Sequence, residues 1–378
     1  MKMMKRTLIV ATTSYAGMGP YVSEIVNTFS PQDDVYFFFH DYEDDFFRKN
    51  VKKELHGKSV FYREANSPLV KILNLLTNKS SYNSKILHFC LEKEIEIVHF
   101  INGAPDRNMQ CKFKQMGIIL LSTVHDLEAH EMDKAWYKMY RQKILNERLA
   151  ENFKVSERII TNSVEQFTRL KGMYPGKKVF YHSFPSLVTK EIEQGKVIPV
   201  EMKNLEKPYI LFFGRIEKYK GVNNLYKAFS ANSELSKNYI LVIAGNGELG
   251  IDGIGRDKNV LLIQRYIMDS EVAYLYKNAA CVVYPYISAT QSGVLSLAYY
   301  FGTPVLASDV PFFKNIIAPN QAGLLFESGN VQNLGSQLMK ILTEDVSGLK
   351  AKEKEYYCSN YDGVALKQQL MEIYESQN

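Results

Sequence analysis

The sequence has few cysteines, no long apolar run and no strong excess of charge of either sign. Its four cysteines, Cys90, Cys111, Cys281 and Cys358, are too far apart to form the Cys-x-x-Cys pairs of zinc sites and redox motifs. We therefore expect no metal framework and a reducing compartment, with Cys90 and Cys281 in the core because their surroundings are apolar. No apolar run approaches the roughly 20 residues that span a bilayer, which predicts a soluble or peripheral protein.

The formal net charge is only +5 over 378 residues. This excess is too small to indicate a nucleic-acid partner, but it fits a phosphate-bearing molecule or the anionic face of a membrane. Charged residues make up 23% of the chain and hydrophobic residues 46%, so the chain can bury ordinary cores and is not disordered. The length predicts about two domains.

Apolar runs that are typical of strands alternate with helical patterns along the whole chain. Most runs are continuous, as expected for parallel strands covered on both faces. The pattern predicts an α/β fold with two doubly wound, Rossmann-like domains that bind ligands at the carboxyl ends of their strands. The predicted strands are residues 7–12, 35–39, 59–62, 97–100, 118–123, 158–161 and 178–181, followed by 209–213, 240–244, 260–263, 281–284, 304–307 and 323–326.

The alternation restarts once, which sets the domain boundaries. We predict a first domain over 1–190, a linker over 191–207 and a second domain over 208–355. The linker contains a glycine and a proline and has no clear period. We expect the last segment, 356–378, to form a helix that crosses back to the first domain. The apolar residues 8–11 are too few for a signal peptide, so we expect them to lie in the first strand.

The most informative stretch follows the predicted strand 209–213. Gly214-Arg215 comes first, and Lys220-Gly221 opens the next helical pattern. A glycine lets the backbone approach a ligand, while a guanidinium fork and a lysine charge both suit phosphate oxygens. A strand, a basic loop and a helix N-terminus together form an anion site. The alternative is a solvated basic loop without a ligand.

Two more strand ends have the same character. Residues 240–244 run into Gly245-Asn246-Gly247, and 281–284 run into a loop that ends in Gln291-Ser292-Gly293. A helix over about 294–301 follows, for which Thr290 and Ser292 are the predicted N-caps. We expect the amides of Ser292, Gly293 and Val294 to bind a diphosphate together with Arg215 and Lys220. The alternatives are a plain tight turn and a capped structural helix.

The order of these motifs resembles that of glycosyltransferase family four, retaining enzymes with the GT-B fold. The resemblance is strongest over about 208–326, where it rests on Gly214-Arg215, Lys220-Gly221, Ala244-Gly245-Asn246-Gly247, Tyr284-Pro285 and the stretch from Ala298 through Gly302-Thr303-Pro304 to Ser308. It implies that Arg215 and Lys220 bind the diphosphate of a nucleotide-sugar donor. It also implies donor contacts from Gly214, Gly245 and Gln291 to Val294, and places Tyr266 and Ile267 against the nucleotide base.

The chain departs from this family at two positions. The family usually carries two glutamates around the late helix, and the corresponding residues here are Ala289 and Leu297. The usual carboxylate contacts to donor sugar and ribose are therefore missing, and the identity of the donor does not carry over. Asp309, just after a predicted strand, is a candidate substitute.

In the first domain, Gly17-Met18-Gly19 follows the first strand and opens a helix. It resembles the glycine-rich first loop of the family, so we expect Gly17 and Gly19 to lie near donor phosphates and acceptor. It is not a dinucleotide fingerprint, because the third glycine is absent. The alternative is an ordinary strand-to-helix turn.

A histidine ends the predicted strand 118–123. His125-Asp126 matches a Thr-x-His-Asp setting of the family, so we expect His125 to contact donor sugar or acceptor. Alternatively, it is a structural histidine bonded to Asp126. His99 and Asn102-Gly103, at the neighbouring strand end, are further candidates to face the ligand.

Residues 134–154 are predicted to form a basic amphipathic helix. Such a face suits anionic lipid, and a lipid-linked acceptor would explain it. The alternative is a helix packed on its own domain.

The sequence thus predicts a retaining, hexosyl-type glycosyltransferase that uses a nucleotide-diphosphate sugar and needs no separate cofactor. By the family's habits, we expect a glycan or lipid-linked glycan acceptor in surface polysaccharide synthesis, in the cytoplasm or on the inner membrane face. We expect no metal, because no Asp-x-Asp motif follows a predicted strand. Two alternatives are a non-catalytic subunit that binds a nucleotide sugar and a nucleotide-sugar epimerase of the same fold.

Overall fold

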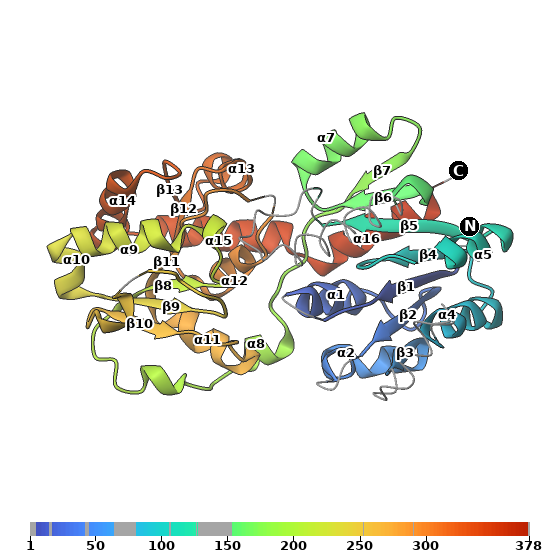
Figure 1. Ribbon diagram of the computed structural model, residues 1–378, viewed down its shortest axis with the longest axis horizontal. Coiled ribbons are helices and arrows are strands. Elements are labelled where there is room, and N and C mark those ends of the chain that lie inside the picture. The colour runs from blue at the N-terminus through green and yellow to red at the C-terminus, as the bar shows by residue number, and fades with distance from the viewer. Residues whose placement is uncertain are drawn as a thin grey trace. The chain divides into compact units, whose positions relative to one another are not determined.

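The computed structural model describes residues 5–14, 17–41, 45–63, 81–105, 107–125, 127, 153–251, 253–289 and 291–376. The chain forms two compact units (Figure 1). The first contains the described residues up to Pro185 and those from Gly363 on, and the second runs from Ser186 to Asp362.

The first unit is built on a seven-stranded parallel sheet with the order β3-β2-β1-β4-β5-β6-β7. All five residues of β1 are buried, as expected for a central strand covered on both faces. The strands are β1 Thr7–Ala11, β2 Val35–His40, β3 Ser59–Tyr62, β4 Ile97–Phe100, β5 Ile119–Val124, β6 Arg158–Thr161 and β7 Lys178–Tyr181. The helices are α1 Met18–Asn27, α2 Phe46–Asn50, η1 Lys53–Lys58, α4 Ser81–Glu92, α5 Arg107–Gln115, α7 Val164–Met173 and α16 Gly363–Glu375.

The second unit has a six-stranded parallel sheet with the order β10-β9-β8-β11-β12-β13. Its strands are β8 Tyr209–Phe213, β9 Ile240–Ala244, β10 Val260–Ile263, β11 Ala279–Tyr284, β12 Val305–Ser308 and β13 Leu324–Phe326. Its helices are α8 Lys190–Gln194, η2 Val200–Met202, η3 Lys218–Lys220, α9 Val222–Ala231, α10 Ser233–Asn238, η4 Ile254–Arg256, α11 Asp269–Lys277, α12 Val294–Phe301, α13 Pro311–Asn320, α14 Val331–Thr343 and α15 Ser347–Asn360.

The strand order places a ligand-binding position in each sheet. The order reverses between β1 and β4 in the first unit and between β8 and β11 in the second. Loops that leave two such strands diverge to opposite faces, which opens a crevice at their carboxyl ends. In the second unit, the loops that leave β8 and β11 contain Gly214 and Pro285.

The predicted fold class is confirmed. All thirteen predicted strands are present in the described chain, with ends that differ by no more than two residues. The first ends at Ala11 instead of 12, because the Thr12 amide donates to the side chain of Asn102 and leaves the ladder. Cys90 and Cys281 are buried, as their apolar surroundings predicted.

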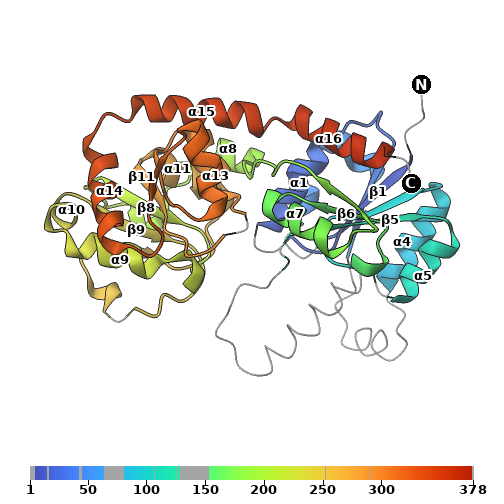
Figure 2. The same ribbon diagram turned by 90° about the horizontal axis from the view of Figure 1, so that it is seen from above.

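The segment 191–207, predicted as a linker, lies on the second unit. Ile192 and Met202 are buried in its core. The Val197 amide donates to the carbonyl of Ser270 in α11 over 3.1 Å. At the other end of the unit, the chain passes to the first unit between Asp362 and Gly363. There α16 packs beside α1, as Figure 2 shows.

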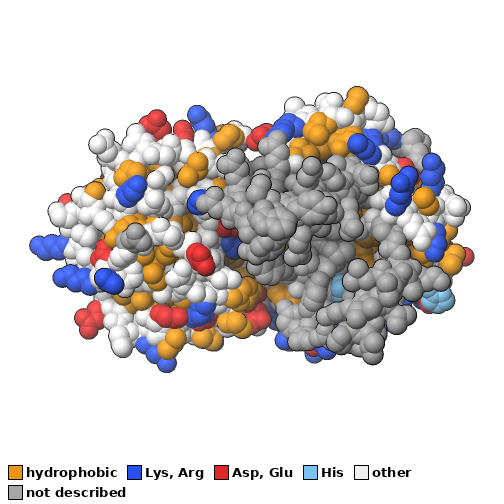
Figure 3. Space-filling view, in the orientation of Figure 1, with side chains coloured by type: hydrophobic (Ala, Val, Ile, Leu, Met, Phe, Trp, Pro, Cys, Tyr) orange, Lys and Arg blue, Asp and Glu red, His pale blue; other side chains and the backbone are white. Residues whose placement is uncertain are grey.

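The face of the second unit that Figure 3 shows carries mixed charge. On the face seen in Figure 3, Lys and Arg side chains are interspersed with Asp and Glu, without a large patch of one sign. This agrees with the small net charge of +5. In the described residues, no helix is long and apolar enough to cross a bilayer.

One acidic side chain is fully buried in the second unit. Glu353 of α15 accepts a hydrogen bond from the Val305 amide at the start of β12 over 2.8 Å. Its other oxygen, Oε2, has no hydrogen-bond partner among the described residues. Burial is the main cause that raises the pKa of Glu353 to about 8. The folded protein therefore holds a neutral carboxylic acid here at pH 7.

This residue predicts a specific pH dependence of stability. Between about pH 4.5 and 8, folded Glu353 keeps a proton that the unfolded chain releases, so the free energy of unfolding falls as pH rises. Glu353→Gln retains an oxygen for the Val305 amide but cannot titrate. Relative to wild type, we expect the variant to gain on the order of 2–4 kcal/mol between pH 5 and 8.5 in urea unfolding. Burial also raises the pKa of Asp269, but this residue affects the pH dependence of unfolding equally in the wild type and the variant. Parallel pH profiles would contradict the prediction.

Candidate functional site

The loops that leave β8, β9 and β11 meet through their backbones. A Cβ on Gly245 would lie 1.9 Å from the Gly214 carbonyl oxygen, and one on Gly221 would lie 1.8 Å from the Pro285 carbonyl oxygen. Both glycines have positive φ, +154° and +67°. Any larger residue would push these loops apart. The glycines therefore hold the three strand ends together at the point where the sheet order reverses.

Lys220 lies inside this junction. Its side chain is only 8% exposed, and its Nζ donates to the Tyr286 hydroxyl over 3.0 Å and lies 4.8 Å from the centre of that ring. A Cβ on Gly214 would lie 3.2 Å from Nζ. In the described chain, no carboxylate forms an ion pair with Lys220. A buried ammonium with only neutral partners favours the binding of an anion.

Tyr286 links Lys220 to the turn before α12, and the sequence analysis missed it. Its hydroxyl also accepts a hydrogen bond from the Ser292 hydroxyl over 3.3 Å. Its carbonyl accepts from the hydroxyls of Ser308 and Ser328 over 2.6 and 3.1 Å. The one signal in the sequence was its place directly after the Tyr284-Pro285 motif. Tyr286 thus fixes the position of Lys220 against the helix N-terminus.

The N-terminus of α12 differs from the prediction in its cap. Thr290 lies outside the described residues, and Ser292 is wrong as the N-cap: the helix starts at Val294, Gly293 is the N-cap, and no side chain caps it. The Ser292 hydroxyl is directed to Tyr286 instead. The first helical bonds come from the amides of Leu295 and Ser296. The amides of Ser292, Gly293 and Val294 precede them, at the positive end of the helix dipole, with half-buried Gln291 just before.

Arg215 is 47% exposed and pairs with Glu217 over 3.0 Å. Glu217 was not among the residues predicted from the sequence, although it is only two positions from Arg215. A phosphate that binds Arg215 must compete with this carboxylate. Arg215 is therefore held at the mouth of the site, whereas Lys220 is held inside it.

Tyr266 and Ile267 follow β10 but have different surroundings. The Tyr266 side chain is 60% exposed, whereas Ile267 is 6% exposed and belongs to the core of the unit. Of the two residues predicted to face the nucleotide base, only Tyr266 has a side chain that is exposed to solvent.

The positions of the two absent glutamates are part of the packing. Leu297 is buried in α12, and Ala289 packs against the same core. Asp309, the candidate substitute, already has a structural bond: its Oδ1 accepts from the Ser328 amide over 2.8 Å. Its own amide donates to the Phe326 carbonyl over 2.8 Å.

Comparison with known proteins points to a family that the second unit resembles. The family model "Glycosyl transferases group 1" matches residues 194–360, which contain every second-unit residue of the predicted diphosphate site. The second unit is therefore similar to a group 1 glycosyltransferase domain. The chain is 27% identical over 195 residues to a glycogen synthase of Thermus caldophilus, covering 48% of this chain and 43% of that protein. It is 26% identical over 179 residues to a phosphatidyl-myo-inositol mannosyltransferase of Mycobacterium leprae, covering 44% and 46%. The matches thus span less than half the length of these relatives.

The whole chain shares its fold with solved structures. The crystal structure of HepE from Anabaena in complex with UDP and glucose matches 99% of this chain and 100% of that one, with a TM-score of 0.69 and 15% identity. The chain therefore consists of two parallel-sheet α/β domains with the GT-B fold that the sequence predicted.

In the first unit, the packing of Gly19 against Phe46 is sufficient to explain one of the two glycines that were predicted to lie near a ligand. Gly17 has φ +84° and is the N-cap of α1. Gly19 lies within α1, where a Cβ would come within 2.5 Å of the Phe46 ring, and its amide donates to the Ser14 carbonyl over 3.1 Å. This amide is already used, whereas Gly17 remains a candidate for backbone contact with a ligand.

His125 directly follows β5, and its ring is held from two sides. Its Nε2 lies 2.7 Å from the Ile101 carbonyl oxygen and therefore carries the proton and donates. The Tyr21 ring meets it edge-on, with centroids 4.9 Å apart. Asp126, the alternative partner, lies outside the described residues. In this tautomer Nδ1 is a hydrogen-bond acceptor.

The expectation that His99 faces a ligand is wrong. His99 is fully buried, with Nδ1 2.9 Å from the Tyr374 hydroxyl and Nε2 2.7 Å from the Thr123 hydroxyl. Burial lowers its pKa to about 3, so the ring is neutral. Asn102, near Gly103, accepts from the Thr12 amide over 2.6 Å and so braces the loop after β1. The predicted basic helix over 134–154 lies almost wholly outside the described residues.

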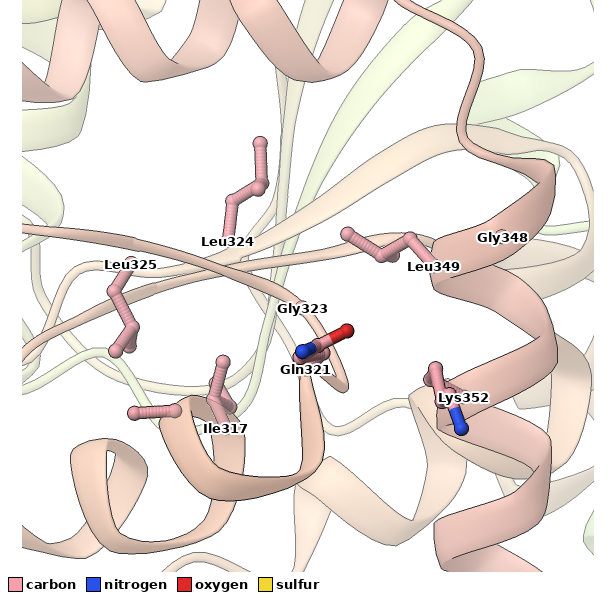
Figure 4. A pocket seen from close by; sticks show the side chains of 9 residues that line it. Ile317, Gln321, Gly323, Leu324, Leu325, Gly348, Leu349 and Lys352 are labelled. Atoms are coloured by element: carbon pink, nitrogen blue, oxygen red, sulfur yellow. The ribbon is translucent and has the colours of Figure 1, made fainter.

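A separate cavity of about 410 Å³ lies between α13, β13 and α15 of the second unit (Figure 4). Its wall includes Ile317, Leu324 and Leu349, with Gln321 and Lys352 as polar members. Gly323 and Leu324, at the amino end of β13, line it, whereas the predicted diphosphate site lies at the carboxyl ends of β8 and β11. The cavity is therefore not part of the predicted diphosphate site.

Proposed function

We propose that this chain is a retaining glycosyltransferase that uses a nucleoside diphosphate sugar. It transfers a hexose to a hydroxyl group of a glycan or lipid-linked glycan acceptor, without a metal ion or a separate cofactor. The family match of residues 194–360 supports the reaction class. The observation that carries the proposal is Lys220, a buried ammonium without a carboxylate partner in the described chain, linked through Tyr286 to the N-terminus of α12.

The geometry is suited to stabilise a leaving nucleoside diphosphate. As the bond between sugar and phosphate breaks, negative charge grows on the departing oxygen. Lys220 and the amides of Ser292, Gly293 and Val294 would meet that charge in a position fixed beforehand, and Arg215 would neutralise the outer phosphate. Retention of configuration follows from the resemblance to family four. In this scheme, the leaving phosphate helps to deprotonate the attacking acceptor hydroxyl.

The donor and acceptor classes rest on relatives. The Anabaena structure holds UDP and glucose, and the mycobacterial relative is named for a phosphatidyl-myo-inositol acceptor. These names support a nucleotide-sugar donor and a lipid-bearing acceptor here. A cytoplasmic protein at the inner face of the membrane, in surface polysaccharide synthesis, fits this pair of substrates.

A second candidate is a non-catalytic subunit that binds a nucleotide sugar. The observation in its favour is that Ala289 and Leu297 stand where the family usually has glutamates, and both pack apolar side chains against the core. The two candidates share a donor site and differ in turnover. Release of nucleoside diphosphate from a donor and acceptor mixture supports the enzyme, and binding without release supports the subunit.

The proposal is tested by thermal unfolding of the protein with UDP, GDP and ADP. At 100 times Kd, a nucleotide should add about 2.7 kcal/mol, which raises Tm by several degrees. The double variant Arg215→Ala/Lys220→Ala should lose this stabilisation. No stabilisation by any of the three would count against a donor site. Activity that disappears with a chelator would overturn metal independence.

A further inference from the structure

Arg265, directly before Tyr266, uses every donor of its guanidinium group. Its Nε and Nη2 donate to the two oxygens of Glu201 over 2.8 and 2.9 Å. Its Nη1 and Nη2 donate to the two oxygens of Glu271 over 2.8 and 2.7 Å. Nη1 also donates to the Tyr266 carbonyl over 3.1 Å. An arginine has five N–H donors, and all five are engaged here.

The two carboxylates come from different elements. Glu201 lies in η2, within the segment 191–207, and Glu271 lies in the first turn of α11. Oε2 of Glu271 also accepts from the Met268 amide over 2.9 Å. The turn 265–268 is thus held at its first residue by Arg265 and at its last by Glu271. Hydrogen bonds to Arg265 lower the pKa of both glutamates, so both are charged at neutral pH.

The group formed by Arg265, Glu201 and Glu271, here called the clamp, lies directly beside Tyr266, whose ring is exposed. Ile267 anchors the turn in the core, while Tyr266 is 60% exposed at the carboxyl end of β10. Two forked, charge-assisted pairs fix orientation more strongly than they add stability, because the Arg265 and Glu201 side chains are 35% and 26% exposed. The geometry therefore favours a positioning role over a role in overall stability.

We propose that Arg265, through Glu201 and Glu271, is a positioning residue that holds the turn 265–268, and with it Tyr266, in the conformation that receives the base of a nucleoside diphosphate. This proposal rests on the proposed function. It makes the segment around Glu201 part of the nucleoside site, although that segment precedes the sheet of the domain. The diphosphate position does not depend on the clamp, because Lys220, Tyr286 and the α12 amides are assembled by the loops after β8 and β11.

If the clamp positions only the turn that receives the base, its loss should weaken nucleoside diphosphate binding but not pyrophosphate binding. Binding of UDP, with GDP and ADP in parallel, and of inorganic pyrophosphate is measured by calorimetry for the wild type, Arg265→Gln and Glu201→Gln. Arg256→Gln is the matched control, because Arg256 is exposed on η4 near the amino end of β10. We expect Arg265→Gln to weaken the best nucleotide about tenfold or more and Glu201→Gln to weaken it less. Pyrophosphate binding should stay within about twofold, and Arg256→Gln should bind both probes like the wild type.

Two results would overturn the proposal while leaving the donor site intact. The first is unchanged nucleotide affinity in both variants. The second is an equal loss of affinity for nucleotide and pyrophosphate, which would mean that Arg265 has a purely structural role. If Arg265→Gln does not fold, Glu201→Gln alone decides between these results. Amide hydrogen exchange over 264–268 provides an independent readout and should become faster in the variants. A wild type that binds no nucleotide would instead overturn the proposed function.

Discussion

Replacing Lys220 with methionine is expected to lower kcat/KM for sugar transfer by about 100-fold or more, with little loss of folding stability. Methionine fills the volume of the lysine stem but removes the ammonium group that we propose to meet the leaving phosphate. The loss of a single preorganised group of this kind costs about 10²–10³ in rate. Lys220 is buried with only neutral partners, so its charge contributes more to ligand binding than to folding. Initial rates at saturating and at low donor concentration, with thermal unfolding in parallel, check both halves of the expectation.

Two further variants make this result specific. Lys218→Met removes an exposed lysine from the same η3 turn and should leave activity within about twofold of wild type. Tyr286→Phe keeps the ring but removes the hydroxyl that receives Nζ and the Ser292 hydroxyl, and we expect a loss of about tenfold. Equal activity of Lys220→Met and Lys218→Met would exclude Lys220 from the transfer step.

The strands and the glycine-bearing turns that follow them could be predicted because their signals are local. A continuous apolar run such as 240–244 is buried on both faces whatever its partners are, so the run alone predicts a parallel strand. The pairing of Gly214-Arg215 with Lys220-Gly221 lies within a single loop. Two close backbone approaches, of Gly245 to Gly214 and of Gly221 to Pro285, lie at strand ends. Their glycines were predicted as sites of close approach from these positions alone.

The errors come from contacts between residues far apart in the chain. His99 ends a strand, as a ligand-facing histidine would, but its ring is occupied by Tyr374, which is 275 residues away. Ser292 is the exception: it stands where a helix cap is expected, but its hydroxyl is taken by Tyr286, only six residues earlier. Glu201 lies in a segment without periodicity, and only the folded chain brings it to Arg265. A single sequence contains no local signal for such partners.

Replacing Arg158 with methionine is expected to destabilise the first unit by about 3 kcal/mol, because a buried charge-assisted network would be left without its donor. Arg158, at the start of β6, is only 1% exposed. Its guanidinium donates to the carbonyls of Ile373 and Ser376 over 2.9 and 2.5 Å, at the C-terminal end of α16. Carbonyls at the end of a helix lack partners within the helix, and the helix dipole favours a cation there. Arg158 therefore fixes α16 to the sheet of the first unit.

The loss of stability in Arg158→Met should affect α16 before it affects the rest of the protein. Amides of α16 should exchange at least tenfold faster in Arg158→Met than in wild type, whereas amides of β8 and β9, in the other unit, should be unchanged at moderate temperature. Arg107→Met, at an exposed position on α5, is the control and should alter neither exchange nor the unfolding midpoint. The Tyr374 hydroxyl bond to His99 still holds α16 in the variant, so release should be partial. If α16 in Arg158→Met exchanged as slowly as in wild type, Arg158 would not be needed to hold the last helix in place, and the packing of α16 on α1 together with the Tyr374 bond to His99 would be sufficient.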